Sequence, residues 1–187
     1  MGLVEAFSNL AAIRNKLGQK KQSLNAAQRA LEAYNSVTDP DPSLTKAAVA
    51  ASVNAANRLM DMRRTEEALA YHREAVRIRR QLNESYPHLF DSDLASSLHN
   101  LAKALAQEGH AAEAFERIDE AIEIYAYLAT LGPGIYGPKL MEVTISRSMI
   151  PDAPALMSQY RAHKRQLAKQ KKREKQKRKK PGRKRRK

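Results

Sequence analysis

Few residues of this chain stand at spacings that are typical of a catalytic site. Ser43 and Lys46 form the pattern S-x-x-K, but the partner motifs of serine acyl-transfer enzymes are absent. We therefore interpret Ser43 as a helix cap that follows Pro42. Residues 132–137 match G-x-G-x-x-G, whose dinucleotide chemistry requires a preceding strand, whereas a helical pattern precedes it here. We predict that residues 132–137 form a connector.

The metal-ligating residue types also lack a coordinating pattern. The sequence has no cysteine, so disulfides and thiolate ligands are excluded. Its histidines show neither H-x₃-H nor E-x-x-H spacing, and they are His72, His88, His99, His110 and His163. His72 stands where a side chain packs between helices. We therefore predict no metal, no cofactor, no small-molecule substrate and no enzymatic activity.

Positive charge is concentrated at the C-terminal end of the chain. Residues 161–187 hold 17 lysines and arginines and one acid, Glu174, for a balance of +16. The other 160 residues hold 17 basic and 19 acidic groups, for a balance of −2. The formal net charge of +14 is therefore a property of this tail, and the chain consists of a nearly neutral body and a polybasic segment.

The tail carries three basic clusters that predict contact with acidic or polyanionic partners. Such runs repel themselves, so we expect disorder. They fit a nuclear-localisation signal read by an import receptor, and they equally suit contact with RNA or DNA phosphates. Because no aromatic residue follows Tyr160, any nucleic-acid binding should be independent of sequence. The residues concerned are Lys171, Lys172, Arg173, Lys177, Arg178, Lys179, Lys180, Arg183, Lys184, Arg185, Arg186 and Lys187.

The body of the chain repeats one pattern of small and large residues. Residues 95–128 place leucines at helical spacing, break at Gly109, and then resume with small residues at fixed positions. A shift of 46 residues lays Leu59 on Leu105, Ala68 on Ala114 and Ala75 on Ala121. A further shift of 45 lays Ala11 on Ala56 and Gly18 on Arg63, but it puts Arg14 where Leu59 and Leu105 stand. We infer three copies of a helix–turn–helix unit.

This pattern resembles the tetratricopeptide repeat, in the long-period form of kinesin light chains and of multi-repeat fungal and bacterial signalling proteins. The resemblance covers residues 4 to about 131. It implies an all-α protein, a right-handed α-solenoid of about three helix-turn-helix repeats followed by a C-terminal helix and the tail. The expected boundaries are 3–37, 43–83 and 93–131 for the repeats, 132–160 for a degenerate repeat or capping helix, and 161–187 for the polybasic tail. Within 132–160, Pro138 should open a short helix, and a last helix should start at Ala155.

The resemblance also implies a groove for a protein or peptide partner. In such arrays the first helix of each repeat lines the concave face, which here assigns Asn9, Asn54, Asn57, His99, Asn100, Lys103 and Gln107. Asparagine recurs at one register, and a ladder of amides can bind a peptide backbone. The alternative is that these amides tie adjacent helices together. Only Lys103 would suit a carboxylate clamp, so chaperone recognition is disfavoured.

These observations predict a non-enzymatic interaction scaffold in the nucleus or nucleolus. The alternatives are a nucleic-acid-binding protein whose repeats recruit partners, and a shortened relative of a larger signalling protein. No apolar run reaches the roughly 18 residues of a membrane span, and no signal peptide is present, so we expect an intracellular protein with no membrane role. Leu3, Phe7 and Leu10 have no preceding helix to cover them, which predicts either a partner on that edge or a shortened array.

Overall fold

The structure is a computed structural model that describes residues 2–38, 40–151, 162, 165–166 and 169. The chain divides into a unit from Met1 to Ile150 and a second from Pro151 to Lys187. Of the segment expected to be helical from Ala155, residues 162, 165–166 and 169 are described and are helical, whereas the basic clusters from Lys171 onward lie outside the described residues. Within the described part the fold is all-helical, with α1 Leu3–Lys16, α2 Lys20–Asn35, α3 Pro42–Asp61, α4 Thr65–Ser85, α5 Asp91–Gln107, α6 Ala111–Leu131 and α7 Pro133–Ser148.

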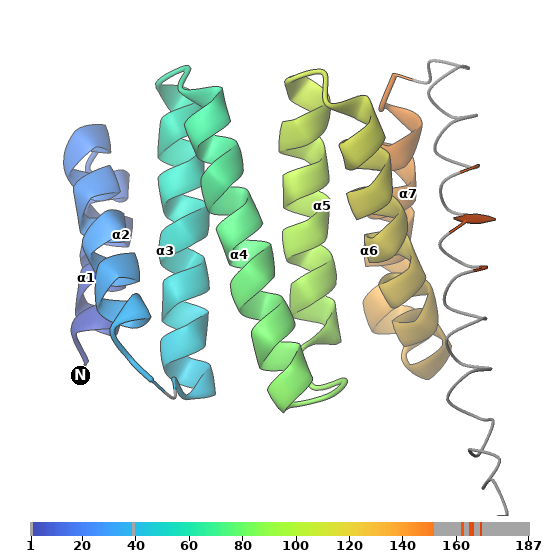
Figure 1. The fold of residues 1–187 in the computed structure, drawn as a ribbon, viewed down its shortest axis with the longest axis horizontal. Coiled ribbons are helices and arrows are strands. Elements are labelled where there is room, and N and C mark those ends of the chain that lie inside the picture. Colours follow the sequence, from blue (N-terminus) through green and yellow to red (C-terminus); the bar gives the residue numbers. More distant parts are fainter. Residues whose placement is uncertain (1, 39, 152–161, 163–164, 167–168, 170–187) are drawn as a thin grey trace, which may run out of the picture. The chain divides into compact units, whose positions relative to one another are not determined.

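The helices of the first unit form consecutive antiparallel pairs. In Figure 1 they stand side by side in chain order, from α1 and α2 at the blue edge to α6 and α7 at the orange edge. Helix α1 packs on α2, α3 on α4 and α5 on α6, while α2, α4 and α6 each pack on the helix that follows. This arrangement confirms the expected helical repeats. No helix in the described part of the chain is both long and apolar enough to cross a lipid bilayer.

Each helix pair turns through the same hydrogen bond and one left-handed residue. Gly18, Arg63 and Gly109 have φ values of 72°, 60° and 80°. The backbone N–H groups of Gln19, Arg64 and His110 each donate over 2.9 Å, to the carbonyls of Arg14, Leu59 and Leu105 respectively. The three turns therefore share the register expected from the sequence shifts. Arg63 adopts the left-handed conformation that glycine adopts without strain in the other two turns.

Small buried side chains let the paired helices approach closely. Ala11, Ala56 and Ala102 stand at equivalent positions of α1, α3 and α5, and each is fully buried. The second helices follow the same rule with Ala30, Ala75 and Ala121, none more than 1% exposed. Larger residues such as Leu59, Leu105 and Ile118 fill the space that the alanines leave. One hydrophobic cluster extends through α1–α4, from Val4 to Ile78, and α5 and α6 bury alanines and leucines in the same pattern.

Two local expectations are wrong. Asp41, rather than Ser43, caps α3, because its Oδ1 accepts the Leu44 N–H over 2.8 Å, while the Ser43 hydroxyl donates to Glu5 Oε1 over 3.0 Å. Helix α7 begins at Pro133 instead of Pro138, so the expected connector is helical. Proline at a first helical position loses no helix hydrogen bond. The carbonyl that Pro138 leaves unpaired is that of exposed Gly134, which water can reach.

The turn geometry predicts that Arg63→Gly stabilises the protein. Glycine removes the cost of the left-handed conformation but adds freedom to the unfolded chain, so we expect a net gain of about 0.5–1 kcal/mol. The change in the free energy of unfolding is measured by urea denaturation, with the helical circular-dichroism signal as the readout. The matched variant Gly109→Ala should lower stability by about 1 kcal/mol, since no atom lies within 4 Å of the added Cβ and only backbone strain acts. Equal midpoints for all three proteins would contradict the prediction.

Candidate protein-binding groove

The residues assigned to the groove lie on the first helices of the pairs, in two environments. Asn9 on α1, Asn57 on α3, and Lys103 and Gln107 on α5 are exposed. Asn54 on α3 and Asn100 on α5 are half-buried. His99 on α5 is only 6% exposed. Six of the seven assigned side chains are thus accessible to a partner, and one lies inside the packing.

The recurring asparagines point away from the buried alanines of their own helices. Asn9, Asn54 and Asn100 each precede a fully buried alanine by two residues, as for Asn54 and Ala56. Two residues correspond to a rotation of about 200° around an α-helix, so the amide faces roughly opposite to the packed alanine. Because α1 packs on α3, Asn9 and Asn54 come from neighbouring helices. The repeated spacing therefore carries the amides to the surface of each first helix.

These three amides form no hydrogen bond with any described part of the chain. Other polar side chains tie the helices together instead. The Ser23 hydroxyl donates to the Ala11 carbonyl over 2.8 Å, and the Ser52 hydroxyl donates to the Tyr71 carbonyl over 2.7 Å. The interpretation that the asparagines join adjacent helices therefore has no hydrogen bond to support it. Their donors and acceptors stay available for a ligand.

His99 is engaged between α5 and α7. Its Nε2 lies 2.8 Å from the Ser146 hydroxyl of α7. Burial lowers the pKa of this imidazole, and the nearby Glu142 carboxylate partly opposes that effect by raising it. The sequence pattern did not identify Ser146 as a partner, because 47 residues separate it from His99 and α7 follows no repeat register. The imidazole is used within the fold and does not line an open surface.

The described residues form no cluster with the geometry of a metal site. They contain no group of three or more His, Asp or Glu side chains that could hold a metal ion. His72 is 6% exposed and has its pKa lowered by burial, as expected for a histidine that packs between helices. The surface of the first helices carries amides without a hydrogen-bond partner among the described residues, together with isolated polar groups. This arrangement is suited to binding a peptide.

Comparison with known proteins assigns the repeats. Residues 50–87 and 94–132, which correspond to α3–α4 and α5–α6, match the family model described as tetratricopeptide repeat. The chain therefore contains two segments that are similar to tetratricopeptide repeats. The first helix pair lies outside the matched segments, but it makes the same turn and buries the same alanine positions as the two matched repeats.

One curated relative is named as a regulatory protein. Over 108 residues the chain is 35% identical to "Regulatory protein RapG" of Bacillus subtilis (strain 168). The match spans 58% of this chain and 27% of that protein, so the chain covers about a quarter of the relative's length. The tetratricopeptide repeats themselves point to interaction with other proteins.

Among solved structures, the crystal structure of BtubC (BKLC) from P. vanneervenii aligns with a TM-score of 0.48. It is 17% identical, and the alignment covers 98% of this chain and 84% of that one. At this level of similarity it adds nothing to the assignment, which depends on the repeats themselves.

The buried histidines predict that stability falls with acidification. Burial lowers the pKa values of His72 and His99 below the ordinary 6.5, so the unfolded chain binds protons first as the pH falls. The free energy of unfolding should therefore decrease below about pH 6.5. Urea midpoints at pH 7.5 and 5.5 measure this change, and His72→Gln should reduce it. The control Asn35→Ala, at an exposed position of α2 without a titratable side chain, should keep the full dependence. Identical pH profiles for both variants would contradict the prediction.

Proposed function

We propose that this chain is a non-catalytic scaffold that binds a partner protein along its first helices, α1, α3 and α5. The observation that carries the proposal is the set of asparagines, Asn9, Asn54 and Asn100, at one register of successive repeats with no hydrogen bond to any described residue. Lys103 and Gln107 extend the same surface along α5. The partner is an extended peptide segment or a helix of another protein.

The chemistry of the amide explains why such a surface suits a peptide. Each asparagine side chain offers N–H groups that donate to a peptide carbonyl and an oxygen that accepts from a peptide N–H. Main-chain hydrogen bonds of this kind hold a peptide regardless of its side chains, and neighbouring residues then supply specificity. Each bond contributes about 0.5–1.5 kcal/mol. Two amides acting together therefore change affinity by about tenfold or more.

The groove predicts that Asn54→Ala combined with Asn100→Ala removes partner binding while the fold is kept. Affinity purification of the tagged chain with quantitative mass spectrometry measures partner capture, and thermal melting measures stability. Because neither amide is bonded within the described chain, stability should stay within about 0.5 kcal/mol of the parent. Asn35→Ala, on the second helix α2, is the matched control and should retain the partners.

Two results would contradict this prediction. Unchanged partner capture by the double variant would show that the groove amides do not bind. A loss of about 2 kcal/mol or more in stability would show that the amides support the fold after all.

We further propose that residues 161–187 deliver the protein to the nucleus or nucleolus through an import receptor. The support is the sequence itself, with 17 basic residues in this segment and clusters at Lys171–Arg173, Lys177–Lys180 and Arg183–Lys187. Lysine and arginine clusters of this kind are typical of import signals. The second candidate function for the same charges is sequence-independent binding of RNA, with the repeats recruiting a protein to it.

Removing residues 169–187 distinguishes these two functions of the tail. If about 6–10 of its cations neutralise phosphates, affinity for single-stranded RNA should fall with salt on a log–log slope of about −4 to −7. The affinity should not depend on RNA sequence. Fluorescence anisotropy at several salt concentrations measures binding, and a fluorescent fusion reports nuclear accumulation. Removal of residues 169–187 should abolish both the RNA binding and the nuclear accumulation.

Other outcomes assign the tail differently. Loss of accumulation with no RNA affinity in the intact protein leaves the tail as a targeting signal alone. RNA binding that survives truncation places that activity in the repeat body.

A further inference from the structure

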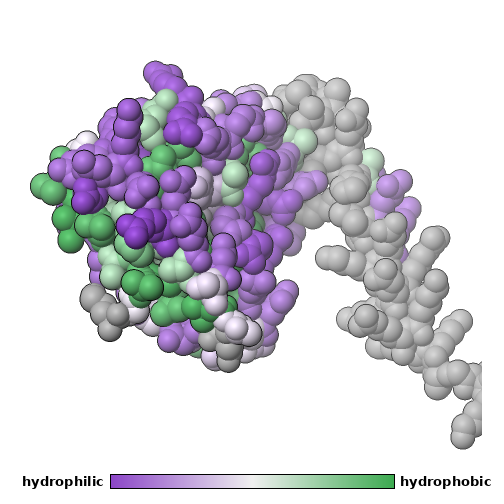
Figure 2. Space-filling model, turned by 60° about the vertical axis from the view of Figure 1, so that its left-hand side comes forward, coloured by the Kyte–Doolittle hydropathy of each residue, from purple (hydrophilic) through white to green (hydrophobic). Residues whose placement is uncertain are grey.

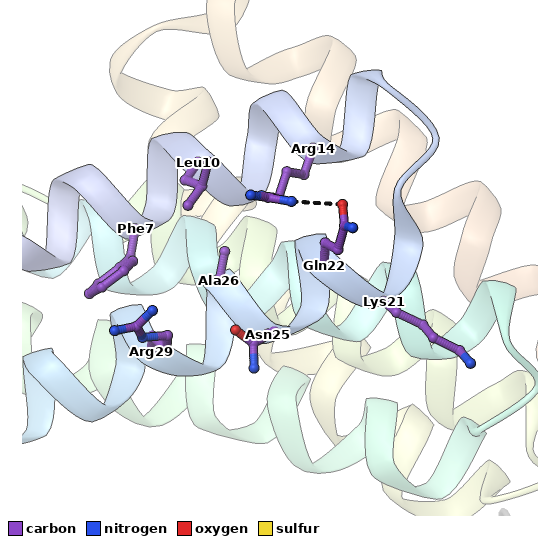
Figure 3. Close-up of a pocket in the computed structure, with 8 residues that line it drawn as sticks. All are labelled: Phe7, Leu10, Arg14, Lys21, Gln22, Asn25, Ala26 and Arg29. Carbon is purple, nitrogen blue, oxygen red and sulfur yellow. Dashed lines mark hydrogen bonds between the residues drawn. The ribbon is translucent and has the colours of Figure 1, made fainter.

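An open cavity of about 330 Å³ lies between α1 and α2. Its lining residues are Phe7, Leu10 and Arg14 of α1 and Lys21, Gln22, Asn25, Ala26 and Arg29 of α2, and Figure 3 shows the Lys21 side chain extending outward from the others. We call this the edge cavity. In α4 the residues equivalent to Asn25, Ala26 and Arg29 are Ala70, Tyr71 and Glu74, and they border a cleft against α2. The edge cavity is therefore on the side of the first pair where another helix would pack.

The edge cavity combines an apolar floor with unpaired cations. Phe7 and Leu10 are half-buried against the core, and Ala26 is 3% exposed. Figure 2 turns this side of the array toward the reader and shows green apolar atoms lying between purple hydrophilic ones. The cations are Arg14, Lys21 and Arg29, and none of the residues lining the cavity is acidic.

Two of the cations are held in place over this floor. The guanidinium carbon of Arg29 lies 4.4 Å from the centroid of the Phe7 ring. Arg14 donates from Nη1 to Gln22 Oε1 over 2.7 Å and to Gln19 Oε1 over 3.3 Å. Neutral amides orient this guanidinium without compensating its charge. A carboxylate that reaches the cavity would therefore meet preorganised cations.

Arg14 breaks the rule that the other repeats follow. Its equivalents are Leu59, which is 1% exposed, and Leu105, which is fully buried. Both leucines lie in the core of the array, where an arginine would leave a buried charge without a partner. At the open edge the arginine stays half-buried and charged. The first pair thus presents a cation where the later pairs present an apolar side chain.

The charge of Arg29 at the edge cavity is opposite to that of the equivalent residue at the contact between α4 and α6. There, Arg73 of α4 donates to Glu113 of α6 over 2.9 Å, and Arg80 donates to Glu120 over 2.6 Å. The residues of α2 that correspond to Glu113 and Glu120 by the repeat shifts are Gln22 and Arg29. A helix with the arginines of α4 would therefore face Arg29 with like charge. The open edge selects against another repeat of this design and requires carboxylates instead.

We propose that the edge cavity docks an amphipathic helix of a partner protein whose apolar face is flanked by carboxylates. Its apolar side chains cover Phe7 and Leu10, and its carboxylates pair with Arg14, Lys21 and Arg29. A second copy presenting the same face is disfavoured because arginine would meet arginine, and the basic tail is disfavoured for the same reason. This surface is distinct from the asparagines of the groove, so the proposal does not depend on the groove.

A designed peptide tests the proposal on the full chain. The probe is a fluorescein-labelled helix of about 18 residues, or five turns, with leucines along one face and glutamates on both flanks. Its matched peptide has lysine in place of every glutamate. Fluorescence anisotropy should show the acidic peptide binding at least about tenfold more tightly. Arg14→Glu with Arg29→Glu should weaken that binding about tenfold or more.

Two further variants separate the edge cavity from other sources of charge. Lys46→Glu with Lys103→Glu changes net charge equally at exposed positions of α3 and α5, and it should retain the binding. Arg14→Leu introduces the leucine of the other repeats, so this variant should fold at least as well as the parent. Its affinity for the acidic peptide should nevertheless be lower than that of the parent. Circular dichroism checks the fold of each variant.

Three outcomes would overturn the proposal. Absence of binding, or equal binding of both peptides, would show that the edge cavity does not select acidic helices. Full binding by the Arg14/Arg29 variant would assign the attraction to the polybasic tail. An equal loss in the Lys46/Lys103 control would assign it to the groove helices or to net charge.

Discussion

Close contact between helices through small side chains is the constraint on which this array depends. An alanine such as Ala11, Ala56 or Ala102, fully buried in each first helix, leaves no room for a larger residue at the crossing. That spacing lets Leu59, Leu105 and Ile118 interdigitate across each pair. Because every pair repeats it, the position of each surface residue follows from its distance along the helix to the buried alanine.

The polar surface follows from the same geometry and divides into distinct roles. Hydroxyls such as those of Ser23 and Ser52 bond to backbone carbonyls across helices. Arginine–glutamate pairs such as Arg80 and Glu120 join α4 to α6 at the solvent-exposed edge, where each contributes at most about 1 kcal/mol. The asparagines and the edge arginines belong to neither set. The asparagines form no hydrogen bond with a described residue, and no described carboxylate lines the cavity beside the edge arginines. We therefore propose that both sets serve binding.

The first pair and α7 depart from the pattern that the second and third pairs share. At the first pair, Arg14 stands half-buried where later pairs bury leucine. Helix α7 contacts α5 through Ser146 and α6 through Arg147, which donates to Asp119 over 2.6 Å. Departures from the repeat pattern therefore mark the surfaces where packing requirements relax and other interactions decide the residue type.

The sequence by itself determined the helical class, the three pairs, their turns and the buried alanines, because the spacing of small and large residues reports which face of a helix is packed. It also showed Arg14 as an exception. Only the tertiary structure decided that α7 begins at Pro133, that His99 pairs with Ser146, and that the asparagines form no hydrogen bond with a described residue. These outcomes depend on which side chains meet across different helices, and no pattern within one helix encodes that meeting.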